Sequence, residues 1–478
     1  MKLIKKNFIY NNLYNLVNLL IPLIIFPYIS RIFGPVGLGK ISFTISLVST
    51  FVIISSLGIP IYGIREISKV KNDKILLSKT FIEVFSIQLI WLIIIMLFYG
   101  IWISFTNTFQ GDYILKIVSF FHLVGLVCII NWFYQGIENY RFVTIVNVGI
   151  KFLTIILVFL FVNNEDQYWL YYCILVGPIF LAFILSLINT KQHLIFSLKN
   201  LSLKKHVKSI GIIFATQVAI GVYTNLSIVF LKYFSNDEQV GFFTPALRLV
   251  KISTTVITAL GIVLIPKITE FVKNNNITEC NLIIVKSIKY TFLVSSPLVV
   301  LIYLNANEII LIFAGENFNQ SIVLLKYLTP LIIFIGLSNI FGLQILIPFH
   351  KEKLYLYAVV LGSVFSIFLN YFLMTTLQSK GAVYAILITE FIIALCTGFY
   401  AIKTLSFRYP FKTILIYVFL SLLFIPITLF TGVYFKGWVL LIVNFGSCFL
   451  LYFFGLILFN ERFFIDKIFY PVFKIQIK

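Results

Sequence analysis

The sequence predicts an all-α polytopic membrane protein with about fourteen transmembrane helices. They are expected to form two pseudo-symmetric six-helix lobes around a central cavity, followed by two C-terminal helices. Three observations predict this fold: the composition, a series of long apolar segments, and a pattern that occurs once in each half. Of the residues, 60% are hydrophobic and 11% are charged, whereas a soluble domain has about 25% charged residues. The composition therefore excludes an ordinary soluble protein.

The apolar segments are each long enough for a helix to cross a bilayer, which takes about 20 residues. They fall near residues 11–31, 41–63, 81–101, 114–134, 143–162, 168–188, 208–231, 242–265, 289–305, 323–347, 354–377, 381–402, 411–433 and 437–459.

The net charge of +20 comes from 37 Lys and Arg against 17 Asp and Glu. Most of the basic residues lie in alternate connections, as the positive-inside rule predicts for cytoplasmic loops. The segments that would then face outward hold only Arg31, Lys40, Lys232, Lys380 and Lys436. The distribution favours an even number of spans with both termini in the cytoplasm, and it argues against nucleic acid as a partner.

A basic connection over residues 191–207 is predicted to be a cytoplasmic loop between the lobes. Residues 1–190 would form the N-terminal lobe with spans 1–6, and residues 208–403 the C-terminal lobe with spans 7–12. Residues 404–478 would hold spans 13 and 14 and a cytoplasmic tail.

The second span of each predicted lobe carries a similar pattern. Residues 37–66 and residues 241–270 both begin with glycine and end with a glycine, a proline, a basic residue and a glutamate. Parallel repeats of this kind occur in transporters that bind their substrate between two halves.

Catalytic chemistry finds no support in the sequence. The four histidines (His122, His193, His206 and His350) are scattered, and there is no metal-ligand cluster or Walker-type glycine loop. We therefore predict no catalytic residue, no metal and no cofactor.

Charged residues inside apolar segments are the candidates for a binding site. Arg248 and Lys251 are three residues apart and share one face of the eighth span. Lys151 lies inside the fifth span, and Arg31 follows Pro22 and Pro27 at the end of the first. Each buried cation costs about 2.5–3.5 kcal/mol at a helix centre on insertion scales. These four cations are predicted to line a cavity suited to phosphate or pyrophosphate.

Secondary candidates have simpler explanations. Lys116 and Lys326 lie toward span ends, where they could extend to the membrane interface instead. Asn225 follows Gln217 and Gly221 at helical spacing, which is also typical of close helix packing. Glu390 is alone in its span and could bind a proton or pair with a lysine.

Two further features call for interhelical contacts. Gly362, Ser366 and Asn370 form a second small and polar stripe, for which we expect close packing. Glu83, at the start of the third span, is expected to pair with Arg65 or Lys79.

Several segments resemble the Wzx-type polysaccharide flippases, members of the superfamily that also holds lipid II flippases and multidrug (MATE) antiporters. They are GPVGLG (34–39), GIPIYGIRE (58–66), WFYQGIENYRF (132–142), YTNLSIVFLKYFSNDEQVGFFTPALRLVK (223–251), and LSNIFGLQILIP with the HKEK that follows (337–353). Where such relatives usually carry an aspartate in the seventh span, this chain has Ser227, so an ion-coupling role of that acid does not carry over.

The resemblance implies a flippase of the bacterial inner membrane. It would move undecaprenyl-pyrophosphate-linked oligosaccharide repeat units to the outer leaflet by alternating access, for O-antigen or another surface polysaccharide. Membrane lipids, and by resemblance a polysaccharide polymerase and a chain-length regulator, are the expected partners. A cation antiporter of the same superfamily is the alternative, and a polytopic polymerase or glycosyltransferase is a second one. The glycan, the coupling ion, the oligomeric state and the role of the last two spans stay open.

Overall fold

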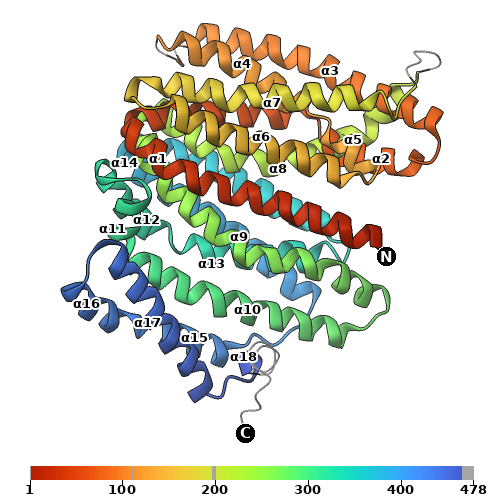
Figure 1. Ribbon diagram of the computed structural model, residues 1–478. Coiled ribbons are helices and arrows are strands. Elements are labelled where there is room, and N and C mark those ends of the chain that lie inside the picture. The colour runs from red at the N-terminus through yellow and green to blue at the C-terminus, as the bar shows by residue number, and fades with distance from the viewer. Residues whose placement is uncertain (1, 107, 110, 196–200, 466–478) are drawn as a thin grey trace. The chain divides into compact units, whose positions relative to one another are not determined.

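The computed structural model describes residues 2–106, 108–109, 111–195 and 201–465, and within some helices only the backbone. Parts of the predicted loop 191–207 and of the C-terminal tail thus lie outside the described residues. Every element in the described part is helical (Figure 1). The elements are α1 (Lys2–Ser55), α2 (Ile59–Val70), α3 (Lys74–Phe105), α4 (Tyr113–Cys128), α5 (Asn131–Gly136), α6 (Tyr140–Phe161), η1 (Glu165–Gln167), α7 (Tyr168–Thr190), α8 (Lys204–Phe234), α9 (Asp237–Lys273), α10 (Ile277–Leu304), α11 (Ala306–Phe313), η2 (Glu316–Phe318), α12 (Asn319–Leu328), α13 (Leu331–Ser338), η3 (Asn339–Leu346), α14 (Glu352–Thr404), α15 (Phe411–Leu422), α16 (Phe424–Tyr434), α17 (Gly437–Leu458) and α18 (Arg462–Phe464).

Ten helical stretches in the described part are long and apolar enough to cross a membrane, or eleven if the bent pair Glu316–Leu328 and Leu331–Leu346 is one span. This confirms the all-α polytopic fold. The number fourteen stays a prediction, because α1 and α14 each cover two of the expected spans.

Each of these two long helices contains one residue with non-helical dihedral angles. Gly34, with φ 60° and ψ −171°, interrupts α1 within the GPVGLG motif, and Gln378, with φ 51°, interrupts α14. Both residues have a positive φ, which glycine adopts at low cost and glutamine does not. The helix is therefore interrupted at Gly34 without strain and at Gln378 with strain.

The chain forms two compact units, residues 1–241 and residues 242–478. The predicted lobe boundaries at residues 190 and 208 stay a prediction. In the first unit α8 packs against α1, so this helix is part of the same compact body. Helices α3, α4, α6 and α7 lie side by side in the upper part of Figure 1.

Two of the sequence motifs pack on each other in the first unit. A Cβ atom at Gly63 would lie 2.3 Å from Cε3 of Trp132, and one at Gly136 would lie 2.6 Å from Cγ2 of Ile67. Glycine at both places allows α2 and α5 to approach closely. The GIPIYGIRE and WFYQGIENYRF segments thus form one structural feature.

The pattern shared by residues 37–66 and 241–270 has a different backbone conformation in each copy. Gly58, with φ 68°, stands between α1 and α2, so the first copy breaks there. The second copy stays helical through Gly261 and Pro266 inside α9. In the second unit, α10 packs against α15, α16 and α17, which lie together in the lower part of Figure 1.

Candidate functional site

Three of the predicted site residues come together in the second unit. Arg248 and Lys251 lie on α9, where the Arg248 side chain is half-buried and that of Lys251 is exposed. Glu390, on the second half of α14, is buried, and its charge and that of Arg248 both act on the ammonium of Lys251. The carboxylate of Glu390 thus lies near a lysine, and the summed charge of these three groups is positive.

The π-helical segment η3 carries two polar side chains that lie beside α9. A Cβ atom at Gly261 of α9 would lie 2.3 Å from Oδ1 of Asn339 and 2.9 Å from Nε2 of Gln344. Gln344 is 3% exposed, and its Oε1 has no hydrogen-bond partner. π-Helical turns are frequent at functional sites. Here the turn brings two amide side chains up to α9 inside an apolar bundle.

The predicted cations of the first unit lie on separate helices. Arg31 on α1 is exposed, and its Nη1 donates to the carbonyl oxygen of Pro27 at 2.9 Å. Lys151 on α6 is half-buried, and its charge acts on His122 of α4. A chamber shared by these cations and those of the second unit stays a prediction.

The secondary candidates are dispersed. Lys116 on α4 is half-buried, and Nζ of Lys326 on α12 lies 5.7 Å from the centroid of the Tyr303 ring. Asn225 is half-buried on α8, one turn beyond Gly221, where a Cβ atom would lie 2.4 Å from Cδ1 of Ile53. Close packing therefore explains Gly221 in this stripe.

The second stripe also packs closely. A Cβ atom at Gly362 would lie 2.4 Å from Cγ1 of Ile393, and Nδ2 of the fully buried Asn370 donates to Ser366 at 3.1 Å. Oδ1 of Asn370 has no hydrogen-bond partner. The expectation of close packing is confirmed for these two halves of α14.

A cluster of ion pairs that we did not predict lies in the first unit, on the predicted outer face. Nζ of Lys40 lies 2.9 Å from Oδ2 of Asp112 and 3.2 Å from the Tyr168 hydroxyl, which also donates to Asp112. Nζ of Lys232 lies 2.5 Å from Oδ2 of Asp237. We call these five residues the outer cluster.

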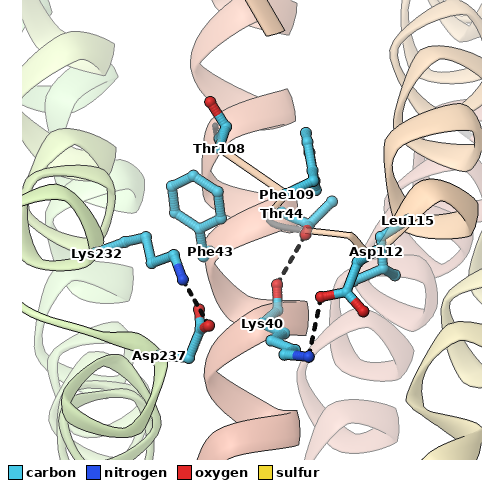
Figure 2. Close-up of a pocket in the computed structure, with 9 residues that line it drawn as sticks. All are labelled: Lys40, Phe43, Thr44, Thr108, Phe109, Asp112, Leu115, Lys232 and Asp237. Carbon is cyan, nitrogen blue, oxygen red and sulfur yellow. Dashed lines mark hydrogen bonds and ion pairs between the residues drawn. The ribbon is translucent and has the colours of Figure 1, made fainter. Parts of the chain in front are cut away.

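The four charged residues of the outer cluster line a small cavity of about 60 Å³. Figure 2 shows the Lys232 and Asp237 pair on one side of Phe43 and the Lys40 and Asp112 pair on the other. The cavity has room for a few water molecules, and Oδ1 of Asp237, buried beside it, has no hydrogen-bond partner among the residues that the structure describes. The pairs join α1 to the segment before α4 and α8 to the first turn of α9.

Two glycines bring the backbones beside this cluster into contact. A Cβ atom at Gly39 would lie 1.7 Å from the carbonyl oxygen of Asp237, and one at Gly241 would lie 1.9 Å from that of Pro35. No side chain fits at either position in this conformation. The segment Pro35–Gly39 and the first turn of α9 are therefore held together by backbone contact as well as by charge.

A second ion-pair cluster lies at the predicted cytoplasmic face. The carboxylate of Glu83 is fully buried, and its Oε2 lies 2.6 Å from Nζ of Lys205 and 3.0 Å from Nε2 of His206. Its Oε1 accepts from the backbone N–H of Ser202 at 2.7 Å. The expected pairing with Arg65 or Lys79 is wrong. Arg65 pairs instead with the adjacent Glu66, with Nε 3.1 Å from Oε1.

Glu66 belongs to the GIPIYGIRE motif and stays charged there. Partial burial would raise the pKa of its carboxyl, but hydrogen bonds from Lys69 and Arg65 outweigh burial and hold the pKa below its ordinary value. The motif therefore carries a paired carboxylate at the end of α2.

Except for Lys232 and Asp237, which are five residues apart, the pairs in these two clusters join residues far apart in the chain, and sequence reasoning missed them for that reason. One signal was present for the outer cluster: Lys40 and Lys232 are among the few basic residues in segments predicted to face outward, and both have an aspartate partner. For Glu83, helical spacing indicated only neighbours in sequence, whereas its partners are more than a hundred residues away.

Two known proteins with similar names match most of this chain. The chain is 22% identical to a candidate O-antigen transporter of Escherichia coli (strain K12) over 391 residues, which cover 81% of this chain and 94% of that one. A similarly named protein of Shigella dysenteriae is 22% identical over 396 residues, covering 82% and 98%.

Solved structures confirm the fold. The lipid II flippase MurJ in an inward closed conformation matches 95% of this chain and 99% of its own, with a TM-score of 0.68 and 16% identity. An inward-facing MATE family multidrug transporter of the MOP superfamily matches 82% and 93%, with a TM-score of 0.63 and 16% identity.

The model of the family described as "Polysaccharide biosynthesis protein" matches residues 4–272, more than half of the chain. Together with the motifs quoted above, this match shows that the chain is a member of the polysaccharide biosynthesis protein family.

Proposed function

We propose that the protein is a flippase that moves undecaprenyl-pyrophosphate-linked oligosaccharide repeat units from the cytoplasmic to the outer leaflet of the bacterial inner membrane. The family match and the relatives named as O-antigen transporters support a transporter of polysaccharide intermediates. The observation that carries the substrate class is the group of Arg248, Lys251 and Glu390 within apolar helices.

The charge of this group suits a pyrophosphate. An isolated cation in a membrane helix is costly, so charges kept there are usually paired or functional. Two cations with one carboxylate leave an excess of one positive charge, which an anionic ligand can neutralise. Arginine can also bind two phosphate oxygens at once. The polyprenyl tail would stay in lipid while the charged head and the sugars follow the polar path.

The outer cluster accounts for the closed outer end that alternating access requires in one conformation. We assign to Lys40, Asp112, Lys232 and Asp237 the closure of the outer end of the first unit in this conformation. The backbone contacts at Gly39 and Gly241 reinforce that closure. Release of a glycan on the outer face would then require these contacts to part, and their partial exposure keeps the energetic cost modest.

The test is reconstitution of the full chain in liposomes with a fluorescent polyprenyl-pyrophosphate oligosaccharide. We expect the lipid to reach the opposite leaflet only in vesicles that contain the protein. Imposing a proton or sodium gradient in the same assay shows whether movement is ion-coupled. Absence of movement together with efflux of cationic dyes would contradict the proposal in favour of the antiporter, and growth of the glycan chain would favour a polymerase.

A further inference from the structure

A second cavity, unrelated to the residues discussed above, lies in the second unit and has a volume of about 530 Å³. It is formed where α10 is followed by α11 and where α16 is followed by α17. Ligand pockets in proteins commonly measure about 300–1,000 Å³. Its position at the ends of these helices places it at a membrane interface rather than at mid-membrane.

Two hydrogen-bonded asparagines stand among the mostly apolar residues that line the cavity. Nδ2 of Asn444 donates to Oδ1 of Asn305 at 2.5 Å, and Nδ2 of Asn305 donates to the carbonyl oxygen of Leu301 at 2.9 Å. Both asparagines are 1% exposed and line the cavity. Each side-chain amide has two N–H groups, and these bonds use one of each. The wall can therefore donate two more hydrogen bonds to an acceptor.

The rim carries two opposite charges. Glu308 on α11 and Lys436 between α16 and α17 both line the cavity. Oε1 of Glu308 accepts from Nδ2 of Asn307 at 3.3 Å. Within the part of the chain that the structure describes, neither charged group takes part in an ion pair. A carboxylate and an ammonium on one rim, each without an ionic partner, fit a ligand that carries both charges.

Aromatic and apolar side chains beside the rim indicate contact with lipid. Tyr434 is 67% exposed and Trp438 is 66% exposed, and such residues concentrate at the level of lipid headgroups. On the adjacent surface of α16, Leu429 is 67% exposed and Val433 is 76% exposed. A headgroup in the cavity could therefore continue into acyl chains lying against α16.

We propose that this cavity binds a zwitterionic phospholipid whose headgroup ends in a primary ammonium, the phosphatidylethanolamine class. The ammonium donates to the carboxylate of Glu308, and the phosphate accepts from Lys436 and from the free N–H groups of Asn305 and Asn444. A primary ammonium has three donor hydrogens, whereas a trimethylated choline has none. The site therefore distinguishes ethanolamine from choline headgroups through Glu308.

The test is native mass spectrometry of the full-length protein in detergent, titrated with dioleoyl-phosphatidylethanolamine, with the choline lipid of the same chains as comparison. For the wild type we expect tighter binding of the ethanolamine lipid. Glu308→Gln should weaken its binding at least about tenfold, the loss of one charged hydrogen bond, and remove the preference over choline. Lys436→Gln should weaken both lipids alike.

Two glycines supply a matched pair of variants. Gly432 lines the cavity, and no atom lies within 4 Å of a Cβ atom placed there, so the side chain of Gly432→Leu starts in open space. Gly446 on α17 also has open space around its Cβ position but does not line the cavity. We expect Gly432→Leu to abolish binding of both lipids and Gly446→Leu to leave it unchanged.

Three results would overturn the proposal: equal affinity of the wild type for the two lipids, wild-type binding by Gly432→Leu, or wild-type binding by Glu308→Gln. Displacement of the bound phospholipid by free oligosaccharide would assign the cavity to a glycan and also overturn it. Equal thermal unfolding temperatures of the Gly432→Leu and Gly446→Leu proteins establish that a loss of binding is local.

Discussion

The ammonium nitrogen of Lys205 lies 2.6 Å from Oε2 of Glu83, a carboxylate with no exposed surface. Lys205 stands in the first turn of α8, which begins at Lys204 and so includes the last residues of the predicted inter-lobe loop, and Glu83 stands on α3. His206 and the backbone of Ser202 complete the contacts of this carboxylate. The segment that leads from the loop into α8 is thus fixed to the first unit.

Glu83→Gln tests that attachment. The amide keeps the size of the side chain but loses the charge that Lys205 and His206 face. Because Glu83 is buried, we expect the free energy of unfolding to fall by about 1–3 kcal/mol, measured by denaturant unfolding of the purified protein in detergent. Glu316→Gln, at an exposed position, is the control and should change it little. Equal stability of the two variants would contradict the assignment.

Gly39→Ala tests the backbone contact at the outer cluster. The new methyl group would meet the carbonyl oxygen of Asp237, and overpacking of this kind costs about 1–3 kcal/mol. We expect the first turn of α9 to be displaced, so that a cysteine introduced at Phe43 reacts faster with a membrane-impermeant maleimide. In the control Gly177→Ala, the Cβ position is open, and the reaction rate should stay at the wild-type value.

Exchanging the charges of Lys40 and Asp112 tests whether transport depends on the pairing of these two residues or only on a charge at each position. Lys40→Asp and Asp112→Lys each place like charges together, and we expect each to reduce export of the glycan. The double variant restores opposite charges and should recover most of the activity. The direct coupling of such a partly exposed pair is about 0.2–1 kcal/mol. An equally inactive double variant would show that the orientation of this pair is not what matters.

Ser227→Ala addresses ion coupling at the position where relatives usually carry an aspartate. Ser227 is 2% exposed on α8, and its hydroxyl cannot titrate in the physiological range. We expect transport and its gradient dependence to stay within about twofold of the wild type, a difference below 0.6 kcal/mol. A large loss of gradient dependence would contradict this expectation.

The sequence predicted well those features that depend on local chemistry. Runs of apolar residues predicted the helices that the structure contains. The close helix packing expected for the stripe Gly362, Ser366 and Asn370 is confirmed at Gly362, which lies against Ile393. In each case the relevant neighbours are close in sequence or follow one helical face.

Contacts between distant segments could not be predicted in this way. Glu83 had basic neighbours at Arg65 and Lys79, yet it pairs with residues brought to it by the packing of α8. Nothing in the sequence marked Asp112 as important, and its role follows only from its ion pair with Lys40 in the structure. The grouping of Arg248 and Lys251 follows from helical spacing, but the approach of Glu390 depends on the fold of α14.

The most direct test of the central claim compares the wild type with the double variant Arg248→Ala and Lys251→Ala in the liposome assay, using two substrates. One is the oligosaccharide linked through polyprenyl pyrophosphate, and the other is the same glycan on an uncharged polyprenyl carrier. We expect the double variant to insert normally and to move the pyrophosphate substrate at least about tenfold more slowly, since each charged contact contributes about 1.5–3 kcal/mol. Lys267→Ala, a change at an exposed lysine of the same helix, should move it at the wild-type rate. Wild-type movement of the pyrophosphate substrate by the double variant, or equal movement of both substrates by the wild type, would contradict the account.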